Sequence, residues 1–293
     1  MKISIIGAGR LGGALAIALS KKDFTIENLV ARNSDAAEKI AGFIKSKPNI
    51  LAPEELFKIT SELIFITTQD SEIETVARKL KENLSHQPFV FHTSGALSSE
   101  ILGELKSVGC RVGSIHPLVS ISDSIRGASK FADAYFCVEG DAEAVEVGRE
   151  IVGKLGGNPF SIETKYKTLY HASAVAACGH LVALVDAAIE MLSKCGLNET
   201  EARKTLLPLI KSTVENLETQ TTSESLTGTF ARADVATFEK HLETLQRNVS
   251  AEILEIYLLL GARSVHLAEK QGADKANLTE ISDKLLLAKT NLK

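Results

Sequence analysis

The sequence predicts an α/β fold in which a doubly wound parallel sheet is followed by an all-α domain. Strand and helix signals alternate up to about residue 162, and only helical signals follow. Each parallel strand needs a crossover connection, usually a helix, so the alternation favours a parallel sheet with helices on both faces. The length of 293 residues fits two domains of ordinary size. We therefore expect one domain at residues 1–162 and a second at residues 163–293.

The first half contains candidate strands separated by helical segments. Ile3–Ile6 is a short apolar run that ends in glycines, and Leu63–Thr67 is almost continuously apolar, as expected for a strand buried on both faces. The other candidate strands are Thr25–Val30, Phe89–His92, Val112–Ile115, Tyr135–Val138 and Pro159–Ile162. Helices are predicted over Leu11–Lys21, Ser34–Lys45, Ser71–Leu84 and Ala142–Leu155, and Pro48 marks a loop.

The second half is a series of predicted helices. Lys165–Lys194 is rich in Ala, Leu and Val and is followed by Gly196, the residue type usual just past a helix end. The other helices are predicted over Asn198–Leu217, Val235–Leu245, Val249–Lys270 and Leu278–Leu292. The most apolar part, Ala172–Leu192, contains His180, Asp186 and Glu190, which a membrane span tolerates poorly. We therefore expect a buried helix of a soluble protein and no contact with a membrane.

The composition argues against several classes of protein. The net charge of −4 leaves no whole-chain basic footprint for nucleic acid, and 5% aromatic residues leave few platforms for base stacking. The four cysteines are far apart and form no C-x-x-C pair, so we expect neither a metal site nor a disulfide framework. The opening residues lack the pattern of a signal peptide. We expect a cytoplasmic protein.

The strongest motif is the G-x-G-x-x-G turn Gly7-Ala8-Gly9-Arg10-Leu11-Gly12. It follows a predicted strand and opens a predicted helix, which is the context of a Rossmann dinucleotide-binding turn. Gly7 would permit the tight turn, Gly9 the close approach of a pyrophosphate, and Gly12 the packing of the helix on the strand. The free N–H groups and the dipole at the helix start favour the anionic pyrophosphate. We expect all six residues to take part in binding a dinucleotide.

The end of the second strand favours NADP over NAD. An NAD site usually has an Asp or Glu about 20 residues past the glycines, where it binds the ribose 2′-hydroxyl. This chain has Arg32, Asn33 and Ser34 there, and a guanidinium suits a 2′-phosphate. The alternative is that Arg32 is a solvated charge and Ser34 the N-cap of the next helix. Thr67 and Thr68 follow another buried strand, so we expect them to contact the cofactor too.

Several motifs together resemble a known superfamily. They are the glycine turn, Ala31-Arg32-Asn33-Ser34, His92-Thr93-Ser94-Gly95-Ala96, Gly113-Ser114-Ile115-His116-Pro117-Leu118 and Tyr170-His171-Ala172-Ser173-Ala174. The chain resembles pyrroline-5-carboxylate reductase, 3-hydroxyisobutyrate dehydrogenase and deazaflavin-dependent NADP oxidoreductase. It resembles more closely a bacterial family that joins a Rossmann-like domain to a helical C-terminal domain of unassigned function. The resemblance implies a C-terminal domain like that of 6-phosphogluconate dehydrogenase. Thr227–Asp234 and His180 depart from the family's usual pattern.

The resemblance also implies roles for residues near a substrate. The related dehydrogenases hold nicotinamide or a substrate carboxylate with a serine- or glycine-rich turn, which makes Ser94 and Gly95 candidate substrate-binding residues; a helix cap is the alternative. Their long helix carries a lysine followed four residues later by a polar partner, and Lys167 with His171 resembles that arrangement. These two residues are candidates for catalytic proton transfer, with a solvated lysine as the alternative. Independently of the resemblance, His116 lies past another predicted strand and before Pro117, which makes it a candidate acid, base or substrate contact, or else a structural loop histidine.

The motifs together predict an NADP-dependent oxidoreductase that transfers hydride between NADP(H) and a small-molecule substrate. Imine reduction, hydroxyacid oxidation and deazaflavin reduction all stay open. We expect a homodimer formed through the helical domain. The alternative is a non-catalytic NADP(H)-binding regulatory protein, because a fold by itself does not determine a function.

Overall fold

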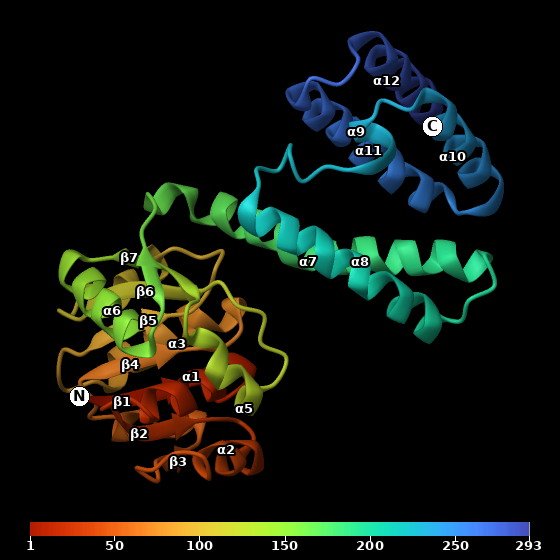
Figure 1. Cartoon of the computed structure of the whole chain (residues 1–293). Helices are drawn as coiled ribbons and strands as arrows, with labels where there is room; N and C mark the ends of the chain where they lie inside the picture. The colour runs from red at the N-terminus through yellow and green to blue at the C-terminus, as the bar shows by residue number, and fades with distance from the viewer. Residues whose placement is uncertain (293) are drawn as a thin grey trace. The chain divides into compact units, whose positions relative to one another are not determined.

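The computed structural model describes residues 1–292, within which eight strands form one sheet (Figure 1). The strands are β1 (Lys2–Ile6), β2 (Thr25–Val30), β3 (Asn49–Leu51), β4 (Leu63–Ile66), β5 (Phe89–His92), β6 (Arg111–Pro117), β7 (Tyr135–Gly140) and β8 (Asn158–Phe160). Their order is β3-β2-β1-β4-β5-β6-β7-β8, and each neighbouring pair is parallel except β6 and β7. With β1 inside the sheet and connections running to both sides, this is the doubly wound arrangement that the sequence predicts.

Helices connect the strands of the first half and build the second half. They are α1 (Arg10–Ser20), α2 (Ser34–Ala41), α3 (Asp70–Asn83), α4 (Gly103–Lys106), α5 (Ser124–Gly127), α6 (Ala142–Leu155), α7 (Lys167–Lys194), α8 (Glu199–Thr219), α9 (Gly228–Ala231), α10 (Val235–Asn248), α11 (Ala251–Gln271) and α12 (Lys275–Thr290). Short 3₁₀ turns lie at Pro53–Lys58, Ser99–Leu102, Ala128–Phe131 and Thr164–Tyr166.

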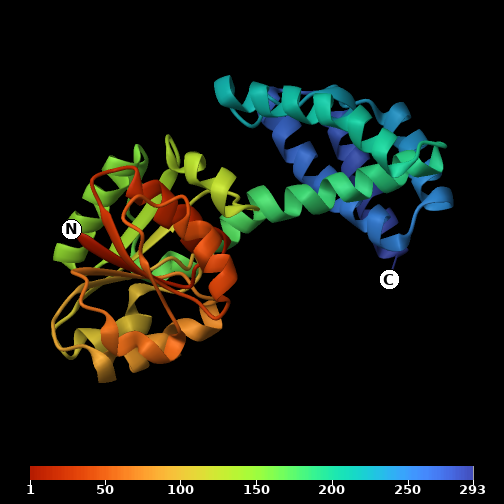
Figure 2. The ribbon, with the colours of Figure 1, turned by 90° about the horizontal axis from the view of Figure 1, so that it is seen from below.

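Helices cover both faces of the sheet, as Figures 1 and 2 show. Alternate residues of β4 point to opposite faces. Leu63 and Phe65 belong to a core that includes residues of α1, α2 and α6, whereas Ile64 and Ile66 belong to a core that includes residues of α3 and α4. All four side chains are fully buried. The almost continuous apolar run in this strand therefore has the cause expected of it, burial on both faces.

The sheet departs from a parallel arrangement at β7, which runs antiparallel to β6. The connection between them, residues 118–134, contains only α5 and a 3₁₀ turn. A helix of four residues rises only about 6 Å, which is too short to carry the chain back along the sheet. The chain therefore re-enters the sheet from the edge at which β6 ends. The strand β3 was not predicted either. It has only three residues and directly follows Pro48, and a proline at such a place is typical of a loop.

The described chain divides into two compact units, Met1–Cys178 and a unit that starts at Gly179. The division falls within α7, whereas we expected the second domain to start at residue 163. The first unit holds the sheet and the first turns of α7. The second unit is helical throughout its described part, and Phe238, Leu258 and Ile281 of α10, α11 and α12 lie in its core. The all-α character of the second half is confirmed.

Helix α7 is exposed along most of its length, so the expectation of a buried helix over Ala172–Leu192 is wrong for the single chain. Leu181 and Val182 are 40% and 69% exposed, and His180 is exposed as well. By length and composition alone, Thr164–Lys194 is long and apolar enough to cross a membrane, since an 18-residue window within it has a mean hydropathy of 1.8. Only 6% of that window is buried within the structure. The sequence could not show this exposure, since an apolar run has the same composition whether its own chain or another molecule covers it.

Candidate functional site

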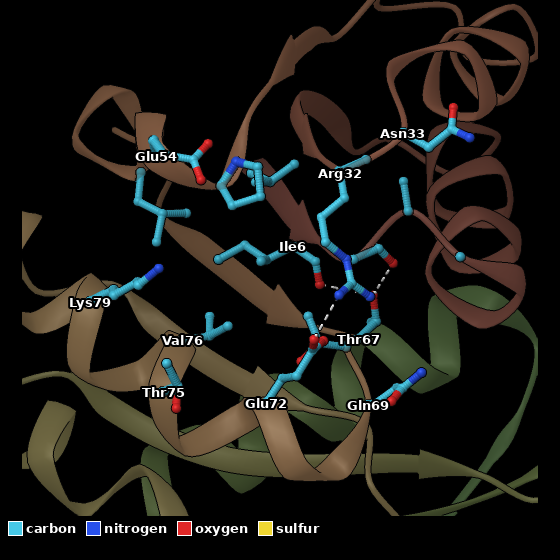
Figure 3. Close-up of a pocket in the computed structure, with 18 of the residues that line it drawn as sticks. Ile6, Arg32, Asn33, Glu54, Thr67, Gln69, Glu72, Thr75, Val76 and Lys79 are labelled. Atoms are coloured by element: carbon cyan, nitrogen blue, oxygen red, sulfur yellow. Dashed lines mark hydrogen bonds and ion pairs between the residues drawn. The ribbon is translucent and has the colours of Figure 1, made fainter.

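A cavity of about 660 Å³ lies at the carboxyl ends of β1, β2 and β4 (Figure 3). Ligands of doubly wound sheets bind at this edge. Its walls are the turn after β1, the end of β2, the 3₁₀ turn after β3 and one face of α3. The predicted cofactor residues that line it are Gly7, Ala8, Gly9, Arg32, Asn33, Thr67 and Thr68.

The three motif glycines have different surroundings, which match the roles that the motif predicts. Gly7 has a φ of +102°, a conformation that favours glycine, and an ideal Cβ on it would lie 2.8 Å from the backbone of Thr67. A Cβ on Gly12 would lie 2.2 Å from the carbonyl oxygen of Gly7 and 2.2 Å from Oγ1 of Thr67. A Cβ on Gly9 would meet no described atom within 4 Å. The turn is therefore closely packed on its inner side and open at Gly9, in front of the α1 N-terminus.

Arg10, Leu11 and Gly12 lie in the first turn of α1, outside the cavity lining. The N–H groups of a first helical turn have no acceptor within the helix, so these residues offer backbone donors rather than side chains to a ligand. Gly12 is buried under the turn, where its lack of a side chain permits the close packing described above.

Two neighbouring threonines after β4 have different roles. Oγ1 of Thr67 donates to the carbonyl oxygens of Gly7 (2.7 Å) and Ile6 (3.1 Å), so this hydroxyl holds the glycine turn in place. Oγ1 of Thr68 is buried and has no hydrogen-bond partner among residues 1–292. A buried hydroxyl without a partner is unfavourable by about 1–3 kcal/mol, so Thr68 is suited to bind a polar ligand.

Arg32 reaches across the cavity to Glu72 of α3, with 3.0 Å between Nη1 and Oε1 (Figure 3). The arginine side chain is 73% exposed, so the ion pair is accessible to a ligand. Asn33 is the N-cap of α2, since its Oδ1 accepts from the N–H of Ala36 at 3.0 Å. The alternative that Ser34 caps this helix is therefore wrong. Ser34 is the exposed first residue of α2 and lies outside the lining.

Part of the cavity wall was not among the predicted residues. Glu72, Thr75, Val76 and Lys79 all line the cavity from α3. Their i, i+3, i+4, i+7 spacing places them on one helix face, and this spacing was the signal that could have identified them. Figure 3 shows Lys79 and Glu54 on the side of the cavity away from Asn33, which leaves charged groups of both signs at the rim.

A second group of predicted residues lies farther along the same edge, after β5 and β6. Oγ of Ser94 donates to Oδ2 of Asp70 (2.8 Å) and accepts from the N–H groups of Ala96 and Leu97. The serine thus joins the start of α3 to the turn after β5 and orders that turn. Gly95 is buried, and an ideal Cβ on it would lie 2.3 Å from Nδ1 of His171 and 2.7 Å from Nε2 of His116.

Lys167 is fully buried, with 1% of its surface exposed. Its Nζ donates to Oγ of Ser114 at 2.9 Å and lies 3.7 Å from Oε1 of Glu139. Glu139 is also buried and accepts from the N–H and the Oγ of Ser99 at 2.9 and 2.8 Å. The alternative of a solvated lysine is therefore wrong. The contacts tie the start of α7 to β6 and β7, and a catalytic role for Lys167 stays a prediction.

Two histidines of this region, the buried His92 and the half-buried His116, have lowered pKa values. His92 lies at the end of β5, where its Nδ1 accepts from the N–H of Ser94 at 3.1 Å. Burial lowers the pKa of His92 to about 4. Burial, together with the nearby Lys167 ammonium, lowers the pKa of His116 to about 4 as well. Nδ1 of His116 lies 2.7 Å from the hydroxyl of Tyr170, a residue of α7 that had been assigned no role.

Among residues 1–292, His, Cys, Asp and Glu form no cluster of three or more that could hold a metal ion. All four cysteines are free; Cys110 and Cys137 are buried, whereas Cys178 and Cys195 are exposed. The cavity is lined by apolar residues such as Ile6, Val30 and Leu56 beside its polar and charged groups, a mixture that suits the binding of an organic ligand.

Comparison with protein families agrees with this architecture. Residues 1–117 match a Rossmann-like domain, and residues 134–264 match a domain of unknown function, DUF2520. None of the curated proteins matches the chain in sequence.

Solved structures share the fold over nearly the whole chain. A protein from Thermotoga maritima is 25% identical, with a TM-score of 0.72 over 92% of this chain and 99% of its own. A candidate NADP oxidoreductase from Bacteroides fragilis is 22% identical, with a TM-score of 0.72 over 90% of this chain and 97% of its own. Pyrroline carboxylate reductase from Plasmodium falciparum, solved with NADP bound, is 15% identical, with a TM-score of 0.58 over 96% of this chain and 97% of its own. The chain thus consists of a Rossmann-like domain followed by a DUF2520 domain, as the resemblance predicts.

Proposed function

We propose that this protein is an NADP-dependent oxidoreductase that transfers hydride between NADP(H) and a small substrate. The observation that carries the proposal is the cavity at the end of β1, where the open face of Gly9 lies beside the helix start and the unpartnered hydroxyl of Thr68. Among the structural neighbours are reductases, one of them with NADP bound, and this supports the same class of activity.

The residues of the cavity fit a nicotinamide dinucleotide. The first turn of α1 offers backbone N–H groups to a pyrophosphate, and Gly9 lets an anion approach them closely. Thr68 offers a further hydroxyl. When bound, the cofactor supplies the hydride chemistry, and the chain supplies binding and orientation.

Arg32 supports NADP as the preferred nucleotide. Its ion pair with Glu72 is exposed, and exposed ion pairs are worth no more than about 1 kcal/mol. A 2′-phosphate offers charge-assisted, bidentate hydrogen bonds and can therefore replace the glutamate.

The substrate residues of this proposal lie at the ends of β5 and β6 and at the start of α7. Gly95, His116 and His171 lie close together there, and the hydrogen bonds of Ser94 order the turn that carries Gly95. We assign proton transfer to His171, because its Nδ1 is buried and unpartnered among residues 1–292, whereas the Lys167 ammonium is already bonded to Ser114. The lysine supports this site by holding the start of α7.

We propose further that a second copy of the chain covers the exposed apolar side chains of the helical half. Val182 of α7 is 69% exposed and Leu209 of α8 is 65% exposed. Exposed apolar side chains that gather on one surface mark interaction sites. Light scattering in buffer without detergent should give the mass of a dimer for the wild type. Val182→Asp should shift the measured mass towards that of a monomer. A monomeric wild type, or recovery of the protein only with membranes, would contradict the dimer.

Calorimetric titration with NADPH and NADH tests the proposed function. NADPH should bind at least about tenfold more tightly, because a phosphate–guanidinium contact is worth about 1.5–3 kcal/mol. Equal affinities would contradict the preference for NADP, and failure to bind either nucleotide would contradict the function. Binding of NADPH without turnover of ketoacids, cyclic imines or a deazaflavin would favour a non-catalytic regulatory protein.

A further inference from the structure

Three ring side chains meet at the carboxyl end of β6. His116 comes from β6, and Tyr170 and His171 come from the first turns of α7. The rings of His116 and His171 lie edge to face, with centroids 5.6 Å apart and an interplanar angle of 84°. All three residues belong to the unit Met1–Cys178.

The position of Gly95 makes the two imidazoles converge. A side chain on Gly95 would collide with Nδ1 of His171 and Nε2 of His116, since an ideal Cβ would lie 2.3 and 2.7 Å from them. Both imidazole nitrogens therefore lie close to the Cα of Gly95, where any residue with a side chain would collide with them. Nδ1 of His171 is buried and has no hydrogen-bond partner in the described chain. A buried polar atom of this kind requires a partner from a ligand or from solvent.

The hydrogen bond between Tyr170 and His116 is coupled to the choice of the nitrogen that carries the proton of His116. Burial raises the pKa of Tyr170, so its hydroxyl keeps its proton. Within residues 1–292, Nδ1 of His116 is the hydrogen-bond partner of this hydroxyl, at 2.7 Å. A protonated phenol can donate to Nδ1 or accept from it; when it donates, the proton of the neutral imidazole is on Nε2. In that tautomer the site over Gly95 has one N–H donor, on Nε2 of His116, beside the unpartnered Nδ1 of His171.

We propose that His116 and His171 together bind the hydroxyl group of an alcohol substrate, with Tyr170 as the residue that holds His116 in its donating tautomer. A hydroxyl oxygen accepts from Nε2–H of His116 while its proton is donated to Nδ1 of His171. After oxidation, the carbonyl oxygen accepts from both nitrogens. This inference rests on the proposed function and names its substrate class, an alcohol and the corresponding ketone or aldehyde.

Oxidation of an alcohol bound in this way removes one proton and one hydride from it. The O–H bond breaks and its proton passes to Nδ1 of His171, which becomes an imidazolium. The carbinol C–H bond breaks, its electron pair leaves as hydride to the oxidised nicotinamide dinucleotide, and the C=O bond forms. The reverse reaction returns the proton from His171 to the carbonyl oxygen. His116 stays neutral throughout and stabilises the developing charge on oxygen as a hydrogen-bond donor.

The arrangement selects against a protonated imine and against the ammonium form of its amine product. A protonated imine has no lone pair on nitrogen with which to accept from Nε2–H of His116. The buried Lys167 lies 3.7 Å from Glu139, which compensates its charge, so an alcohol over Gly95 meets a neutral donor on His116 and a neutral acceptor on His171. A neutral oxygen that becomes more negative during reaction matches such donors better than a cation does.

Nitrogen-15 NMR of the histidine side chains in the NADP⁺-saturated protein tests this inference. At neutral pH, His116 should be the Nε2–H tautomer. Cyclopentanol should shift the signals of Nε2 of His116 and Nδ1 of His171, whereas cyclopentylamine, matched to it in ring shape, should not. An Nδ1–H tautomer, no response to cyclopentanol, or a response to the amine alone would overturn the proposal.

Variants separate positioning from binding. Tyr170→Phe should give His116 a mixture of tautomers and weaken the response to cyclopentanol about tenfold, while Tyr166→Phe, at an exposed tyrosine nearby, should change neither. His171→Asn should abolish the shift at His116. NADPH affinity should stay within about twofold in all three variants. An unchanged tautomer of His116 in Tyr170→Phe would overturn the role of that tyrosine. Failure of the wild-type protein to bind NADPH would instead refute the proposed function.

Discussion

The two regions at the carboxyl edge of the sheet are built in different ways. The nucleotide cavity follows from one short motif and from backbone geometry: Gly7 at a φ of +102°, Gly9 open, and Gly12 packed under the turn. The region over Gly95 consists of side chains from strands and a helix far apart in the chain, since His116 and Tyr170 are 54 positions apart. The first region carries exposed charge at Arg32, whereas in the second region burial lowers the pKa of His116 to about 4 and favours its neutral form.

This difference shows where selectivity can arise. An exposed guanidinium paired to one glutamate can exchange its partner for a phosphate at little cost. Buried neutral imidazoles cannot exchange partners so freely, because each unpaired nitrogen is unfavourable by about 1–3 kcal/mol. The cavity therefore discriminates between nucleotides by their charge. The region over Gly95 discriminates between substrates by the hydrogen-bonding pattern of a neutral group.

The largest expected effect is that of pH on the buried histidines. His92 and His116 have pKa values lowered from 6.5 to about 4, so the unfolded chain binds their protons at higher pH than the folded chain does. Their contribution to stability is complete above pH 6.5 and is lost as the pH falls towards 4, by up to about 3 kcal/mol for each group. Urea denaturation at successive pH values measures this loss.

His92→Asn keeps an acceptor for the N–H of Ser94 and removes the titrating ring, so it should flatten the fall in stability. His266→Asn, at a half-exposed histidine of α11, is the matched control and should leave the fall as in the wild type. A wild type whose stability stays constant down to pH 4 would contradict the picture of two buried neutral histidines.

Gly12→Ala should disturb the nucleotide cavity next most strongly. Its Cβ would lie 2.2 Å from the oxygen of Gly7, so the turn must open and the backbone donors at α1 must move. The loss of one or two charge-assisted hydrogen bonds corresponds to about tenfold to 100-fold weaker NADPH binding by calorimetry. Gly153→Ala in α6 is the control, because a Cβ there meets no described atom within 4 Å. Equal NADPH affinities in both variants would refute the role of the turn.

Arg32→Gln should weaken NADPH binding by about tenfold and leave NADH binding unchanged, since only NADPH carries the 2′-phosphate. Arg78→Gln removes the same charge from an exposed position of α3 outside the cavity lining and should alter neither affinity. Equal decreases in the affinities for NADPH and NADH in Arg32→Gln would mean that the arginine supports the structure of the cavity and does not bind the 2′-phosphate.

Glu72→Gln should have the smallest effect. It removes the partner that competes with a phosphate for Arg32, so NADPH affinity should rise by no more than about fivefold, the range of an exposed ion pair. Calorimetric titration of Glu72→Gln and of Arg32→Gln with NADPH shows whether the two residues of the ion pair have opposite effects on the affinity. Weaker NADPH binding in Glu72→Gln would show that the glutamate orients the arginine instead of competing with the ligand.

The sequence determined those features of the protein whose physical cause is local. A strand followed by spaced glycines and a helix makes the same turn wherever it occurs, so the cavity's first wall and Arg32 beside it could be predicted. Alternation of strands and helices likewise predicted the doubly wound sheet, and α6 was predicted with its observed bounds. The antiparallel pairing of β7 could not be predicted, because it depends on the path of a connection with little regular structure.

Only the tertiary structure decided how the distant residues are used. Lys167 and His171 share a helix face, yet the lysine is buried against Ser114 and Glu139 while the histidine lies over Gly95. The sequence contains each of these residues but not their partners, because β6, β7 and α7 meet only when the chain folds. The exposure of α7 has the same origin: composition makes a helix apolar, and packing alone determines what covers it.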